Sequence, residues 1–287
     1  MSDPMNQSSQ RIANTLAHLH TQNRTALIPY ITAGDPEPGM TVTLMHSLVE
    51  TGADMLELGV PFSDPMADGP VIQKAVERAL SHQVSLKQVL QMVTEFRQTD
   101  TKTPVILMGY LNPIEAMGVD TFARQAQTAG VDAVLTVDMP PEETEYYLPA
   151  LKKAAMDLIF LVSPTTPQSR LAAVNEQGSG FVYYVSLKGV TGSGQLNEAD
   201  VASHVEALRS QTQMPVAIGF GIRDAKTAYA MAKLGDAVII GSALVKEIET
   251  LSDQGQADLP SVQARLTDKL RSFRVAIDQA DAGETLE

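Results

Sequence analysis

The sequence contains no cysteine, so it can form neither disulfide bonds nor metal sites built from thiolates. It also has no apolar run long enough to cross a membrane, and no secretory signal peptide is recognisable at its start. These absences are compatible with a reducing compartment, and we expect a cytoplasmic protein.

Basic residues are scarce. The chain has 21 Lys and Arg against 34 Asp and Glu, which gives a formal net charge of −13. This balance disfavours a nucleic-acid surface, because such a surface needs a basic stripe. An anionic ligand would have to be held mainly by backbone N–H groups. The five histidines show no metal-ligand spacing, so we expect no metal site.

The 287 residues, 44% of them hydrophobic, suit one large or two medium domains. Short apolar segments alternate with amphipathic helical patterns, and glycine-containing turns with similar sequences recur before residues 55, 133 and 237. Eight strands are predicted, at residues 26–33, 54–59, 104–110, 132–137, 157–162, 181–186, 215–220 and 236–240.

Eight strand–helix units in a chain of this length predict an α/β fold, a closed (β/α)8 TIM barrel. We expect an extra N-terminal helix and extra helices after strands 2 and 8. A single barrel domain would span residues 11–280, with a disordered segment at 1–10 and a frayed acidic tail at 281–287. A doubly wound open sheet is the alternative. It is disfavoured because Ala33-Gly-Asp-Pro36, after the first strand, is no dinucleotide fingerprint.

Two finer predictions concern the helices. Acids near Pro140 and lysines near Lys153 predict one helix between them, since both charges suit the helix dipole. After the third strand we expect one helix, from about Asp120 to Ala129.

The most informative stretch runs from Leu56 to Pro70, where an apolar strand passes into a proline-rich loop. Glu57 lies inside the strand, and a buried carboxylate there is costly unless it is paired or protonated. Asp68 follows where the loop can fold back over the strand end. Two carboxylates in different surroundings can hold different protonation states, as acid–base chemistry requires. The simpler alternative makes Glu57 an outward strand residue and Asp68 a helix N-cap.

In such barrels the chemistry lies at the carboxyl ends of the strands. The polar and glycine residues expected there are Tyr30, Glu57, Tyr110, Asn112, Asp138, Ser163, Tyr183–Ser186, Gly219–Ile222, Gly241 and Ser242. The loops after strands 7 and 8, with Gly192 after strand 6, could bind a phosphate through backbone N–H groups. Met108, Leu135, Leu161, Phe220 and Ile239 could line a flat apolar pocket. Tight turns and ordinary barrel core are the alternatives for these two sets.

Several motifs together resemble one family. The run from Leu56 through Glu-Leu-Gly-Val-Pro-Phe-Ser-Asp-Pro-Met-Ala-Asp-Gly-Pro-Val-Ile to Gln73 closely resembles the signature of the tryptophan synthase alpha chain family. Supporting matches begin at Ile28, Met108, Gly189, Gly219 and Gly241 and follow the family order from about Ile12 to Leu270. Tyr30 stands where a Phe is common.

The resemblance implies a retro-aldol cleavage of indole-3-glycerol phosphate to indole and glyceraldehyde 3-phosphate. By analogy, Glu57 is the general acid–base, and Asp68 accepts the indole N–H. Tyr183 would orient the reacting end, and Thr191 would lock a loop over Asp68. Backbone groups of Gly192, Gly221, Gly241 and Ser242 would hold the phosphate. Tyr30 would lie in the indole pocket.

The resemblance also implies an alpha-beta-beta-alpha complex in which indole passes to a beta chain that holds pyridoxal phosphate. The expected contact segments include Pro61, Asp64, Asn112, Asp138 and Pro140. No pyridoxal phosphate lysine motif is present, so this chain is expected to need no cofactor of its own.

Two other functions remain open from the sequence. Another phosphate-binding barrel enzyme of the same pathway would need a different acid–base set, commonly a Lys or Cys near a strand end. A non-catalytic activator of a beta chain would be expected to lose one of the two acids, and both are present.

Overall fold

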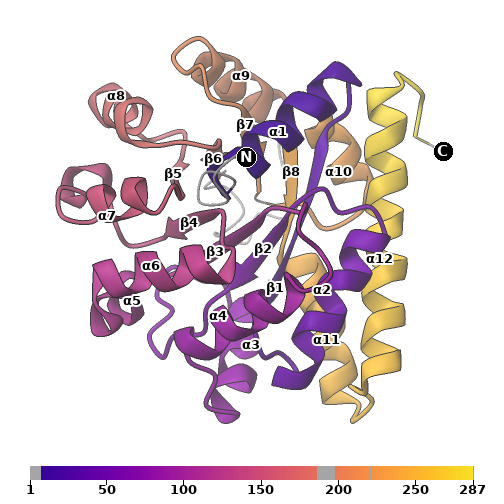
Figure 1. Ribbon diagram of the computed structural model, residues 1–287. Helices are drawn as coiled ribbons and strands as arrows, with labels where there is room; N and C mark the ends of the chain where they lie inside the picture. Colours follow the sequence, from indigo (N-terminus) through magenta and orange to yellow (C-terminus); the bar gives the residue numbers. More distant parts are fainter. Residues whose placement is uncertain (1–7, 186–197, 220, 287) are drawn as a thin grey trace.

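The computed structural model describes residues 8–185, 198–219 and 221–286. Its centre is a closed parallel barrel in which each strand pairs with the next and β8 pairs with β1. Figure 1 shows the barrel surrounded by helices. The strands are β1 (Ala26–Thr32), β2 (Leu56–Gly59), β3 (Val105–Gly109), β4 (Ala133–Thr136), β5 (Asp157–Val162), β6 (Val182–Tyr184), β7 (Val216–Ile218) and β8 (Ala237–Ile240).

The predicted (β/α)8 barrel is therefore confirmed. The helices are α1 (Ser8–Thr21), α2 (Thr41–Glu50), α3 (Pro70–Ser81), α4 (Leu86–Phe96), α5 (Leu111–Met117), α6 (Val119–Ala129), α7 (Leu148–Lys153), α8 (Gln168–Gln177), α9 (Glu198–Arg209), α10 (Ala225–Ala232), α11 (Ser242–Asp253) and α12 (Leu259–Asp281), with short 3₁₀ turns η2 (Pro38–Met40) and η3 (Pro141–Glu143). The extra helices expected before β1, after β2 and after β8 are α1, the pair α3–α4, and the pair α11–α12.

Two helix predictions were wrong in detail. The single helix expected between Pro140 and Lys153 is instead η3 followed by α7. Pro149 explains the break, because a residue without an N–H fits only the first turn of a helix, so α7 begins at Leu148. After β3 there are two helices, since α5 precedes α6 and Gly118, with φ of +85°, separates them.

The hydrophobic core has two layers, because side chains of a barrel strand alternate between its inside and its outside. The outer layer lies between strands and helices and includes Leu27, Leu58 and Val134. The inner layer fills the barrel and includes Ile28, Ile106 and Ile159. Ile12 and Leu16 of α1 join this inner layer, so α1 closes one end of the barrel.

The domain limits stay predictions. Asp281, the first residue of the expected tail, is the last residue of α12. Its carboxylate accepts hydrogen bonds from the Thr25 backbone N–H at 2.9 Å and from the Thr25 hydroxyl at 2.6 Å. None of the helices in the described ranges is long and apolar enough to cross a membrane.

Candidate active site

Glu57 lies on β2, near the carboxyl end of the barrel, where it is paired with Tyr30 of β1 and Ile106 of β3 in the register. Its neighbours Leu56 and Leu58 belong to the outer core layer, so the alternation of a barrel strand turns the Glu57 side chain to the inside, and the residue is only 1% exposed. Within the described residues, its Oε1 atom has no hydrogen-bond partner. A buried carboxyl group without a partner is expected to be protonated, because burial disfavours the charged form.

The electrostatic surroundings agree with this expectation. Burial, and to a smaller extent the negative charge of Asp68, raises the pKa of Glu57 to about 8. A carboxyl group of that pKa is mostly protonated at neutral pH and can still lose its proton there. Glu57 can therefore both give and take a proton under ordinary conditions.

Asp68 ends the loop between β2 and α3, and it is half-buried. It is not the N-cap of α3, because Gly69 occupies that position. The Tyr110 hydroxyl donates a hydrogen bond to Asp68 Oδ2 at 3.0 Å. Burial raises the pKa of Asp68, and the hydrogen bond from Tyr110 partly opposes that rise. The two carboxylates thus have different surroundings.

Two tyrosine side chains accompany this carboxylate pair. Tyr30 on β1 and Tyr183 on β6 are each 6% exposed. Burial first, and then the negative charges of nearby acids, raise the pKa of both phenols well above the usual range. Glu57 is one of those acids for each tyrosine. Both phenols therefore stay protonated and available as hydrogen-bond donors.

Glycine permits the close packing of these tyrosines. A Cβ atom added to Gly59 would overlap the hydroxyl end of Tyr30, and one added to Gly219 would overlap the ring of Tyr183. The Tyr183 hydroxyl donates to the Gly219 carbonyl at 3.4 Å. Gly219, which the sequence assigned to a phosphate loop or a tight turn, thus also makes room for an aromatic ring.

The expected apolar pocket residues lie together. Tyr183, Leu135 and Ile239 belong to the buried inner layer, and Met108 and Leu161 are partly buried against it. Leu135 and Ile239 are each 1% exposed, so they are core residues, whereas Met108 and Leu161 keep some surface. Met108 also packs against the small buried cluster of Tyr30, Ala75 and Val245.

The expected phosphate loops are described in part. Gly241 is the N-cap of α11, and Ser242 is its first residue, so their N–H groups lie at a helix N-terminus. Gly221 has a φ of +77°, which favours glycine. The predicted site residues Thr191, Gly192 and Phe220 lie outside the described residues.

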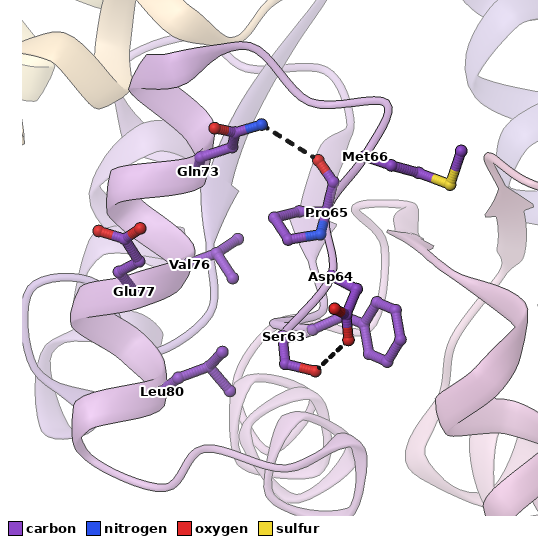
Figure 2. Close-up of a pocket in the computed structure, with 9 residues that line it drawn as sticks. Ser63, Asp64, Pro65, Met66, Gln73, Val76, Glu77 and Leu80 are labelled. Atoms are coloured by element: carbon purple, nitrogen blue, oxygen red, sulfur yellow. Dashed lines mark hydrogen bonds between the residues drawn. The ribbon is translucent and has the colours of Figure 1, made fainter.

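The residues expected at a partner interface differ in exposure. Asp64, Asn112 and Asp138 are exposed, Pro140 is half-buried and Pro61 is buried. A pocket of about 330 Å³ lies between residues 62–66 and α3, and Figure 2 shows Met66 pointing away from that helix. Met66 is 87% exposed. The pocket lining includes neither Glu57 nor Asp68, so this pocket is separate from the carboxylate pair.

Sequence reasoning gave no role to three polar groups near the carboxylates. Tyr110 was expected at a strand end, yet its bond to Asp68 depends on how the loop folds back. The Gln73 side chain on α3 donates to the Asp68 carbonyl at 2.8 Å. Thr32 is 3.1 Å from the Tyr30 hydroxyl. Of the three, only Tyr110 could have been noticed from the sequence, because it lies at the end of a predicted strand.

The fold and the site define a class of protein. A closed (β/α)8 barrel with two dissimilar carboxylates near the carboxyl ends of its strands is an enzyme barrel equipped for acid–base catalysis. In the described part of the chain, no group of three or more His, Cys, Asp or Glu residues could hold a metal ion.

Known proteins define the family. The family model described as Tryptophan synthase alpha chain matches residues 16–273, and the chain belongs to this family. It is 70% identical to the tryptophan synthase alpha chain of Hydrogenovibrio crunogenus, over 94% of this chain and 98% of that one. It is 58% identical to that of Laribacter hongkongensis, over 91% of this chain and 98% of the relative.

Solved structures agree. A crystal structure of the Legionella pneumophila subunit alpha superposes with a TM-score of 0.87 at 46% identity, covering 94% of this chain and 98% of that one. A chain of Mycobacterium tuberculosis tryptophan synthase superposes with a TM-score of 0.82 at 34% identity, covering 93% of this chain and 98% of that one. The chain thus has the role of the alpha subunit in tryptophan biosynthesis, a lyase that cleaves indole-3-glycerol phosphate.

Proposed function

We propose that Glu57 and Asp68 carry the retro-aldol cleavage of indole-3-glycerol phosphate to indole and glyceraldehyde 3-phosphate. The observation that supports this most is the unpartnered, buried carboxyl group of Glu57, whose pKa is about 8, beside a second carboxylate held differently. The cleavage needs one group that moves protons and one that stays negatively charged. The two acids provide these properties separately.

Glu57 alone can carry out both proton transfers of the cleavage. Protonated Glu57 gives its proton to C3 of the indole ring, and the ring becomes an indolenine-like cation. The bond between C3 and the side chain then breaks, its electron pair returns to the ring, and the adjacent hydroxyl becomes the aldehyde. The hydroxyl proton passes to the Glu57 carboxylate, which restores the starting state. Asp68 accepts the ring N–H and stabilises the positive charge that develops there.

The remaining residues bind and orient the substrate in this proposal. Tyr183 orients the reacting end, and Tyr30, Met108 and Leu161 contact the indole beside the buried Leu135 and Ile239. The N–H groups of Gly221, Gly241 and Ser242 hold the phosphate, which suits a chain of net charge −13. Thr191, Gly192 and Phe220 complete the predicted set.

We also infer a partner and a compartment. The alpha-chain role implies a beta chain, which would hold pyridoxal phosphate and convert the released indole to tryptophan in the cytoplasm. The alpha reaction, as written, requires no cofactor in this chain. The exposed residues Asp64, Asn112 and Asp138, with half-buried Pro140, would form the contact. Pro61 is buried and would act only by shaping the loop that carries Asp64.

The test follows indole release from indole-3-glycerol phosphate by the purified chain, alone and with a beta chain. We expect slow release alone and faster release with the partner. Glu57→Gln should abolish release, because an amide cannot transfer the proton. Glu95→Gln, on the exposed face of α4, is the matched control and should behave as the wild type.

The alternatives give different results. Release that persists in Glu57→Gln would remove Glu57 from the acid–base role. A chain that releases no indole, yet stimulates the beta chain, would be a non-catalytic activator, and the proposal for Glu57 and Asp68 would be wrong.

A further inference from the structure

The Tyr110 hydroxyl connects the loop after β2 to the end of β3. It accepts a hydrogen bond from the Ala67 backbone N–H at 3.0 Å and lies 3.0 Å from Asp68 Oδ2. A phenol has a single hydrogen, and a backbone N–H can only donate. The Ala67 bond thus leaves the Tyr110 hydrogen for Asp68, so Oδ2 must act as the acceptor.

The tyrosine itself is firmly held. Tyr110 is 4% exposed and is the N-cap residue of α5. Its ring packs against Phe62 with the ring centroids 5.3 Å apart. The next residue, Leu111, donates its backbone N–H to the Asp138 carboxylate at 2.9 Å. A hydroxyl on such a side chain can fix a group on a neighbouring loop, because the cost of ordering it is met by packing.

We propose that Tyr110 is a positioning residue, whose hydroxyl holds Oδ2 of Asp68 and leaves Oδ1 to accept the N–H of the indole ring. The proposal rests on the assignment of Asp68 as the N–H acceptor made above. Within the described residues, Tyr110 is the one donor bonded to the Asp68 carboxylate. Removing its hydroxyl would free the carboxylate to rotate.

The charged and titratable groups around this contact are mostly acidic or neutral. The charge of Asp68 acts on Glu57 of β2 and on Tyr30 of β1, and the charge of Asp138, after β4, acts on Tyr110. The Tyr110 hydrogen bond lowers the pKa of Asp68 against the effect of burial. Without it, burial acts unopposed, and a larger fraction of Asp68 is protonated at neutral pH.

The first experiment compares Tyr110→Phe with the wild type over a range of pH. We expect kcat/KM at neutral pH to fall about tenfold or more, and its acidic limb to move upward by roughly one pH unit. The loss should be larger in kcat than in KM, because the bond to the ring nitrogen strengthens as positive charge develops.

Tyr147→Phe is the matched control. Tyr147 is fully buried, and its hydroxyl lies 3.3 Å from the Thr136 hydroxyl, in the outer core layer. This variant also loses one buried phenol contact, so it reproduces any general loss of stability. Its pH profile should match the wild type, and thermal unfolding of both variants checks that each is folded.

A second measurement needs no turnover. Carbon-13 NMR of the aspartate carboxyl groups, with Asp68→Asn used to assign the Asp68 signal, gives the titration midpoint of Asp68. We expect a higher midpoint in Tyr110→Phe than in the wild type and in Tyr147→Phe. An unchanged midpoint together with an unchanged pH profile would overturn the role of Tyr110 and leave the proposed function intact. A wild-type chain that releases no indole would instead overturn the proposed function.

Discussion

At the scale of single residues, Glu57 is the least expected side chain in the barrel. A carboxyl group that is 1% exposed and unpartnered at Oε1 costs stability whenever it is charged. Its protonated form avoids most of this cost. Burial of Glu57 therefore costs the fold little stability at low pH, where the carboxyl group is protonated, and more stability at high pH, where it is charged.

This gives a pH-dependent prediction for stability. The pKa of Glu57 is about 8 in the folded chain, against 4.5 for an ordinary glutamate. Between these values the folded chain keeps a proton that the unfolded chain releases, so rising pH destabilises the fold. Glu57→Gln removes this effect. As the pH rises through this range, the free energy of unfolding of the variant minus that of the wild type should increase by roughly 1.4 kcal/mol per pH unit.

Urea denaturation of both proteins at several pH values measures the difference. Glu95→Gln serves again as the control, since Glu95 is exposed on α4. If the stability curves of Glu57→Gln and the wild type run parallel from about pH 5 to pH 8, Glu57 does not carry a raised pKa in the folded chain.

At the scale of elements, three of the turns that precede strands contain the same type of hydrogen bond. The turns before β2, β4 and β8 each place an aspartate whose carboxylate accepts the backbone N–H of the preceding strand. The pairs are Asp54 with Leu27 at 2.8 Å, Asp132 with Val105 at 2.8 Å and Asp236 with Val216 at 2.7 Å. These are the turns in which the sequence showed its weak repeat. The repeat therefore reflects strand pairing at the amino ends of the strands.

The three aspartates differ in their ion pairs, and this predicts different costs. Asp132 is fully buried and pairs with Arg11 and Arg97, each at 2.8 Å. Asp132→Asn would remove the buried counter-charge that Arg11 and Arg97 share, and we expect a loss of roughly 3 kcal/mol in the free energy of unfolding. Asp236 pairs with Arg209, both partly exposed, so Asp236→Asn should cost less than about 1 kcal/mol.

Urea unfolding of the two variants at neutral pH provides the comparison. Both substitutions keep an oxygen that can accept the strand N–H, so the strand bond is preserved. At Asp132 the amide NH2 also replaces the oxygen that accepts from Arg11, so the loss there includes that hydrogen bond as well as the charge. Equal losses for the two would mean that burial of the ion pair does not decide its contribution.

Elements also show where sequence patterns suffice. The apolar segments predicted the strands closely, because a buried parallel strand is a short run of apolar residues between turns. The prediction of one helix from Pro140 to Lys153 was wrong because it relied on the charges that suit a helix dipole and left out Pro149. Pro149 fits only the first turn of a helix, so α7 begins at Leu148. The helix α5 was missed because it is short and carries Pro113 in its first turn.

At the scale of the whole molecule, α1 closes the end of the barrel opposite the carboxylates. Ile12, Leu16 and Leu19 of α1 pack in the inner layer with residues such as Ile28 and Phe181. Without this helix, apolar side chains at the amino ends of the strands would meet water. A barrel interior is a packed core, so its closure contributes to the stability of the whole domain.

Ile12→Ala tests this closure. Ile12 is fully buried, and the substitution should cost about 2–5 kcal/mol in the free energy of unfolding, because it leaves a cavity inside the barrel. Gln10→Ala, at an exposed position of the same helix, should change it by less than about 0.5 kcal/mol. Urea denaturation compares the two, and similar small effects would show that α1 does not close the core.

The candidate site was predictable in part. Glu57, Tyr30 and Tyr183 could be placed at one end of the barrel from the strand pattern alone, since parallel strands bring their carboxyl ends together. The need for glycine at position 219 could not be predicted. It arises because any side chain there would overlap the ring of Tyr183 on the neighbouring strand β6. The same holds for the bonds that Tyr110 and Gln73 make to residues 67 and 68.

The sequence by itself determined the order of the strands and the family, because these follow from local patterns and a contiguous signature. The tertiary structure alone decided that Glu57 is buried without a partner, that Pro61 is buried and that Tyr110 holds Asp68. The physical reason is distance along the chain. Tyr110 and Asp68 are 42 residues apart, and only the pairing of β2 with β3 and the path of the loop after β2 bring them within hydrogen-bond reach.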